Sequence, residues 1–122
     1  MMTYKTYPTI QTSDCKCHKP PLLFSDYKSR LVGIDTTNGR YGEVTIEKCV
    51  HCKSRWLHYL VEYESFSRSG RWYRGLISKK TIKTITPENA VDVLKSLEWY
   101  LYGGSYFSST GQKGQGHVNV DR

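Results

Sequence analysis

The sequence of this 122-residue chain predicts an α+β fold, in which an antiparallel β-meander is followed by one C-terminal helix and a flexible tail rich in Gly and Ser. Residues 43–47 and 55–66 alternate apolar and polar side chains with the period of half-buried strands. After residue 86, apolar residues recur at helical spacing instead. The length, with 38% hydrophobic and 24% charged residues, predicts a single globular domain.

Three strands make up the expected meander. The first, 43–47, follows a turn signal at 38–42 and runs directly into a cysteine pair. The second, 55–66, is rich in aromatic and β-branched residues. Residues 67–70 have the composition of a hairpin turn, so 71–77 are expected to return as the third strand.

One helix is expected after the meander. Thr86 is a suitable N-cap, Pro87 suits the first helical position, and two glycines at 103–104 would end the helix. Its apolar stripe consists of Ala90, Val91, Leu94, Leu97 and Leu101. We therefore expect residues 1–107 to form one α+β domain and the Gly-rich residues 108–122 to form a flexible tail.

The four cysteines form two close pairs: Cys15, Cys17, Cys49 and Cys52. In a Cys-x-x-Cys turn both sulfurs can point at one ion, about 2.3 Å away, and an extended Cys-x-Cys places both side chains on one side. Four thiolates complete a tetrahedral structural zinc site and leave no open position for a catalytic water. His18 and His51 are alternative ligands for a Cys₃His site; buried free thiols or, in an exported protein, a disulfide also stay open.

The strand, cysteine pair and strand within residues 42–77, taken with the first cysteine pair, resemble the knuckle hairpin of zinc-ribbon proteins. Two features depart from that pattern. The first pair has one spacer residue instead of two, and His18 and Lys53 stand where a small Gly commonly follows the second cysteine. The resemblance implies a structural zinc and, by analogy with a class that often binds nucleic acid, a nucleic-acid ligand.

Charge and composition restrict the cellular setting. The chain carries a net charge of +7, and residues 65–87 contain no acidic side chain. Residues 1–8 lack the apolar run of a secretory signal, and no apolar stretch approaches the roughly 18 residues of a membrane span. We therefore expect a cytoplasmic protein without a membrane span, in which the thiols stay reduced and are available to metal.

The sequence favours a non-enzymatic interaction module. It contains neither a Gly-x-Ser-x-Gly nucleophile motif nor a His-Glu-x-x-His metal motif. The main hypothesis is an adaptor, or an inhibitor of the immunity-protein type, whose basic and aromatic surface binds an acidic protein partner. The alternative is nucleic-acid binding by the basic hairpin at residues 68–83. The candidate partner-binding residues are Arg68, Arg71, Trp72, Tyr73, Arg74, Lys79 and Lys80.

Overall fold

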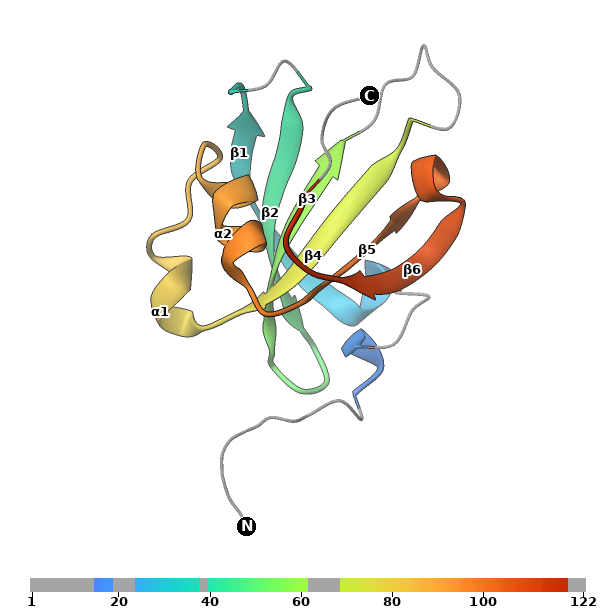
Figure 1. Cartoon of the computed structure of the whole chain (residues 1–122). Helices are drawn as coiled ribbons and strands as arrows, with labels where there is room; N and C mark the ends of the chain where they lie inside the picture. Colours follow the sequence, from blue (N-terminus) through green and yellow to red (C-terminus); the bar gives the residue numbers. More distant parts are fainter. Residues whose placement is uncertain (1–14, 19–23, 38–39, 62–68, 119–122) are drawn as a thin grey trace.

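A computed structural model describes residues 15–18, 24–37, 40–61 and 69–118 (Figure 1). Within them the chain forms a six-stranded antiparallel sheet in which each strand pairs with the next along the sequence. The strands are β1 (Tyr27–Asp35), β2 (Gly42–Cys49), β3 (Arg55–Val61), β4 (Arg71–Ile77), β5 (Tyr100–Gly104) and β6 (Ser109–Gly114). The two helices between β4 and β5 are α1 (Lys79–Ile82) and α2 (Ala90–Ser96).

The expected three-stranded meander is present as β2, β3 and β4, but it forms only half of the sheet. The fold is therefore mostly β, and the α+β description holds only in part. The sequence pattern missed β1 because Lys28, Ser29 and Arg30 are polar in succession and show no alternation. The predicted turns include residues 38–39 and 67–68, which lie outside the described residues.

The C-terminal helix is shorter than its apolar stripe predicts. It ends at Ser96, and Leu101 belongs to β5, where it pairs with Arg74 of β4. Tyr100 and Tyr102 flank Leu101, and this alternation of aromatic residues suits a strand better than a fourth helical turn. Thr86 does not cap the helix directly. It exchanges two hydrogen bonds with Asn89, and Asn89 is the N-cap.

The segment expected to be a flexible tail contains the last strand. Ser109–Gly114 forms β6 and pairs along β5, and Val118 beyond it is only 3% exposed in the core. The hydroxyl of Tyr100 also donates a hydrogen bond to the carbonyl of His117. The segment pairs through its backbone and also packs closely: a Cβ at Gly114 would lie 2.7 Å from the ring of Tyr102.

The main core lies between the sheet and the two helices, which cover the same face (Figure 1). We call this the helix face. Leu57, Tyr59 and Val61 of β3 point into it, as the predicted alternation requires, and Leu94 of α2 packs against them. The opposite face of the sheet, the open face, carries Trp56, His58 and Leu60 in the same strand.

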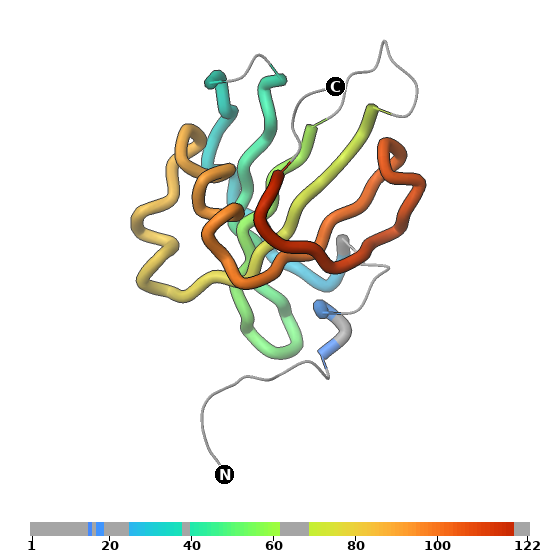
Figure 2. Tube along the Cα trace, viewed as in Figure 1, coloured from blue at the N-terminus to red at the C-terminus, as the bar shows by residue number. Residues whose placement is uncertain are grey.

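A smaller core closes one end of the open face. It contains two of the cysteines and three large side chains: Cys17, Cys49, Tyr27, Trp56 and Leu101. In the chain trace, residues 15–18 lie beside the β2–β3 hairpin (Figure 2), although the hairpin is far from these residues in the sequence. No helix in the described part of the chain is both long and apolar enough to cross a membrane.

Candidate functional site

The second cysteine pair occupies the tight turn between β2 and β3. Cys49 is the last residue of β2; its amide donates to the carbonyl of Ser54 over 2.8 Å, and its own carbonyl accepts from the amide of Lys53 over 3.0 Å. Lys53 has a φ of 68°. This left-handed conformation favours glycine, so Lys53 adopts it only at a conformational cost.

The first cysteine pair is held in a 3₁₀ turn at Lys16–His18 rather than in the extended form that its spacing suggests. The amide of His18 donates to the carbonyl of Cys15 over 3.0 Å. Cys17 is fully buried, and its carbonyl accepts a hydrogen bond from the hydroxyl of Tyr27. The ring of His18 packs edge-on against Trp56, with their centroids 5.0 Å apart. The turn is therefore anchored to the sheet.

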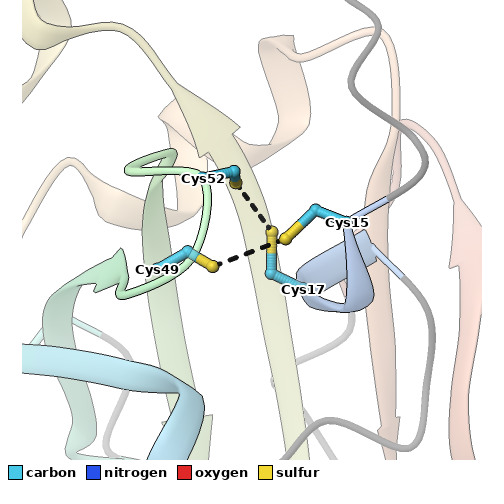
Figure 3. A group of neighbouring side chains, drawn as sticks. All are labelled: Cys15, Cys17, Cys49 and Cys52. Carbon is cyan, nitrogen blue, oxygen red and sulfur yellow. Dashed lines mark hydrogen bonds between the residues drawn. The ribbon is translucent and has the colours of Figure 1, made fainter.

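The four thiols converge at one point (Figure 3). The Sγ atoms of Cys15 and Cys49 are 3.6 Å apart, those of Cys17 and Cys52 are 3.5 Å apart, and all four lie within 4.8 Å of one another. A tetrahedral ion bonded at about 2.3 Å requires neighbouring sulfurs about 3.8 Å apart. The cluster is therefore within metal-binding distance, as the cysteine spacing predicts.

Without a cation at its centre, the close packing of the cluster opposes joint ionisation of its thiols. Burial raises the pKa of the Cys17 thiol, and the neighbouring thiols of Cys52 and Cys15 raise it further. Burial also raises the pKa of Cys15. At Cys52, the most exposed of the four, burial raises the pKa but hydrogen bonding to Ser54 lowers it more, to about 7. Thiols this close resist joint ionisation, and a bound dication reverses that effect.

Neither histidine belongs to the thiol cluster. The Nε2 atom of His51 lies 3.0 Å from the Oδ1 atom of Asp26, and the amide of Val50 donates to the carbonyl of Asp26. These contacts attach the knuckle to the start of β1. His18 packs against both Trp56 and Trp99, whose rings also contact each other. The ligand group found among the described residues consists of the four cysteines, so the Cys₃His alternative has no support in this geometry.

A groove of about 700 Å³ lies on the open face of the sheet. Leu31 of β1 and Thr110 of β6 both line it, so the sheet curves enough to bring its two edge strands to one cavity. Its apolar side chains are Leu31, Leu60 and Trp72. The volume falls in the range of ligand pockets.

The floor of the groove carries buried charges. The Nε atom of Arg74 donates to Oε1 of Glu47 over 2.8 Å, and the residues are 7% and 4% exposed. Burial raises the pKa of Glu47 above its ordinary value, while Arg74 opposes that shift. The ring of His58 lies 3.8 Å from Glu47, and burial, together with the charge of Arg74, lowers the pKa of His58 to about 3. His58 is therefore neutral near pH 7.

The residues that the sequence proposes for partner binding do not form one surface. Arg71 and Tyr73 are each 2% exposed, and the guanidinium of Arg71 lies 3.7 Å from the centre of the Tyr106 ring. Arg74 is buried with Glu47, and Trp72 is half-buried in the wall of the groove. Lys79 and Lys80 are exposed on α1. Arg68 lies outside the described residues.

Sequence reasoning missed the groove residues Glu47 and His58 as a set because they come from different strands. A polar residue on an alternating strand normally indicates a solvent-facing side. The β2–β3 register places Thr45 opposite His58, and the β3–β4 register places His58 opposite Arg74. The sequence signal for the groove was the row of polar residues Glu43, Thr45 and Glu47 on one side of a strand. Such a row is equally typical of a solvent-exposed face and of the polar wall of a groove.

Comparison of the chain with protein-family models, with curated proteins and with solved structures finds no match. The functional argument therefore depends on the geometry of the chain itself. That geometry shows a cluster of four cysteines placed to hold a metal ion, in a six-stranded antiparallel sheet.

Proposed function

We propose that this chain is a non-enzymatic interaction module stapled by a structural zinc ion. The observation that carries the proposal is the convergence of four thiols from two distant chain segments to within 4.8 Å. Zinc is the metal that best suits four thiolates in tetrahedral geometry. Four protein ligands fill its coordination sphere, so no position is open for a reacting water, which supports a structural rather than a catalytic role.

The zinc would act as a cross-link between residues 15–18 and the β2–β3 hairpin. Without it, the cluster holds only weak thiol contacts of 3.5 and 3.6 Å, and the burial of Cys17 opposes formation of the thiolate. Structural zinc can contribute on the order of 10 kcal/mol to the folding of small domains. The ion would thereby fix the smaller core, including Trp56 and Tyr27, at the end of the open face.

The proposed zinc site is tested by replacing Cys49 with Ser and measuring zinc per chain by atomic emission. We expect wild type to retain one zinc and Cys49→Ser to lose it, with cobalt substitution of the wild type giving the absorption of tetrahedral thiolates. His51→Ala and His18→Ala are matched controls and should keep the metal, because their rings lie outside the cluster. Full zinc retention by Cys49→Ser would contradict four-thiolate binding.

We propose that the groove on the open face receives an apolar anchor side chain of a protein partner. Its internal charges, Glu47 and Arg74, already neutralise each other, so the surface left for a partner is formed mainly by Leu31, Leu60 and Trp72. Large apolar and aromatic side chains in pockets of this kind dominate binding energy. Glu43 stands at the same groove, so an acidic anchor is disfavoured there.

A pair of exposed apolar residues on β1 tests the groove. Leu31 lines it and is 58% exposed, whereas Ile34 on the same strand is 43% exposed and is not among its lining residues. We expect Leu31→Glu to abolish partner capture by the tagged full-length protein, and Ile34→Glu to preserve it. Equal capture by both variants would exclude the groove as the binding surface without affecting the zinc proposal.

A further inference from the structure

Three basic residues form a row across one end of the sheet. Lys28 of β1 lies directly opposite Lys48 of β2, and Lys48 lies directly opposite Arg55 of β3. Directly paired side chains share a face, and Lys48 and Arg55 are each two residues from core residues of the helix face, Ile46 and Leu57. We call Lys28, Lys48 and Arg55 the basic row. It lies beside the knuckle, because Cys49 immediately follows Lys48.

The basic row has no acidic partner among the described residues. The ion pair found there joins Glu47 to Arg74, and histidine contacts join Asp26 to His51 and Glu47 to His58; none includes a member of the row. Lys28 and Lys48 are exposed, and Arg55 is half-buried. Like charges placed directly opposite on neighbouring strands destabilise a sheet. A row of three therefore lowers the stability of the fold unless an anion is present.

The negative charge of a zinc ion bound by four thiolates is too small to explain the basic row. A zinc ion bound by four thiolates has a net charge of −2, from +2 and −4. Lys53, in the knuckle turn, adds a fourth cation, and its Nζ atom donates to the carbonyl of Val50. With Asp26, which contacts His51 of the knuckle, the negative charge is −3, so four cations leave a surplus of +1 at this end of the sheet.

The basic row borders a small hollow that exposes positive charge. This hollow, of about 150 Å³, is lined by Lys28, Lys48 and Lys53 together with Cys49 and Val50. It contains no aromatic side chain, and lysine is depleted in the cores of protein–protein interfaces. Lysine and arginine are, in contrast, the usual contacts of phosphate groups in nucleic acids. The composition therefore favours a phosphate backbone over a protein partner.

The shape of the row favours a polymer over a single phosphate. Neighbouring strands are about 4.8 Å apart, so the row spans roughly 10 Å, and β4 leads from Ile77, opposite Arg55, to Lys79 and Lys80 within three residues. Duplex DNA presents one negative charge per about 1.7 Å of its axis. We propose that the basic row is a nucleic-acid site that contacts the phosphate backbone of a duplex without reading its sequence.

This inference goes beyond the proposed function and differs from the hairpin that the sequence suggests. Arg71 and Arg74 of that hairpin are buried, so they cannot supply phosphate contacts. The cations of the row come instead from β1, β2 and β3. The proposed nucleic-acid site is also independent of the groove, because the basic row lies on the helix face and the groove lies on the open face.

The test mixes the zinc-loaded full chain with a fluorescein-labelled DNA duplex of about 20 base pairs. Binding is measured by fluorescence anisotropy at salt concentrations between about 50 and 200 mM. We expect the triple variant Lys28→Gln, Lys48→Gln, Arg55→Gln to bind roughly tenfold or more weakly at about 100 mM salt. Its slope of log affinity against log salt should fall by about 3, one for each lost phosphate contact. A matched variant, Lys83→Gln, Lys95→Gln, Lys113→Gln, removes the same charge elsewhere and should remain within about threefold of wild type.

Folding and competing ligands are checked in parallel. Lys48→Gln should keep its zinc and raise the melting temperature, because it removes like-charge repulsion within the sheet. If the triple variant fails to fold, Lys28→Gln on the edge strand should still lower the salt slope by about 1. Absence of duplex binding at about 50 mM salt, or equal losses in the row and control variants, would overturn the proposal. Row-dependent binding only to phosphatidylserine vesicles would overturn it in favour of a membrane surface.

Discussion

The carboxylate of Glu47 and the guanidinium of Arg74 pair across an intervening strand. Glu47 lies on β2 and Arg74 on β4, so their side chains meet over β3, with Nη2 of Arg74 2.5 Å from Oε1 of Glu47. The guanidinium also lies 4.5 Å from the centre of the Tyr27 ring on β1. A single buried arginine of β4 thus contacts side chains of β1 and β2, both beyond β3, at the floor of the groove.

Removal of one member of this pair should destabilise the protein strongly. Glu47→Gln leaves the guanidinium of Arg74 buried without a counter-charge, and such losses typically amount to about 3–5 kcal/mol. Urea unfolding of the zinc-loaded protein measures the free energy. The double variant Glu47→Leu, Arg74→Met removes both charges and should be clearly more stable than Glu47→Gln. A single variant within about 1 kcal/mol of wild type would show that the pair is hydrated in solution.

His58 should make the fold sensitive to mild acid. Its pKa is about 3 in the folded protein and near 6.5 when unfolded, so between these values the unfolded chain binds a proton that the folded chain does not. Stability should therefore be unaffected above pH 6.5 and should fall as the pH drops below it, at up to about 1.4 kcal/mol per pH unit.

His58→Gln should remove this slope while other acid effects persist. Urea unfolding at about pH 7, 6 and 5.5 compares the two proteins, with zinc content measured at each pH because acid also weakens thiolate binding. Parallel stability curves for wild type and His58→Gln over this range would mean that His58 is accessible to protons in the folded state.

Removal of the metal should be visible in tryptophan fluorescence. The ring of His18 lies 5.0 Å from that of Trp56 and 5.9 Å from that of Trp99, and the metal would hold this turn in place through Cys15 and Cys17. A chelator should release the turn and change the indole emission, and added zinc should restore it. His18→Ala should show a smaller change. Metal loss without any change in emission would show that the turn stays docked without the ion.

Gly75 should be essential for the position of α2. A Cβ atom at this residue would lie 2.8 Å from Cδ2 of Leu94 and would also meet Cδ1 of Leu97. Gly75→Ala should therefore cost about 1–3 kcal/mol, the usual range for overpacking, as measured by thermal or urea unfolding. Adding Leu97→Ala should recover part of the loss by making space. If that second substitution only adds to the loss, α2 does not press on Gly75.

The sequence by itself determined the local features. The alternation of residues 43–47 and 55–66 predicted β2 and β3, with Leu57 and Tyr59 on one face and Trp56 and His58 on the other; residues 62–66 of the predicted strand lie outside the described residues. The close spacing within each cysteine pair, with four thiols in all, predicted the ligand group, because a short turn can aim both sulfurs of one pair at one ion. These features depend on the chain over a few residues and can be recognised without knowledge of the fold.

Only the tertiary structure decided which distant residues meet. Sheet register placed Lys28 opposite Lys48 and brought Glu47 within reach of Arg74, and a shift by one residue would have moved each side chain to the other face. Pairing of Tyr100–Gly104 with β4 ended the helix that the apolar stripe predicted, because the sheet could satisfy that backbone and bury Tyr100 and Leu101 together. Burial likewise removed Arg71 and Arg74 of the predicted basic hairpin from the surface. Such outcomes depend on packing across the whole sheet, which no local pattern encodes.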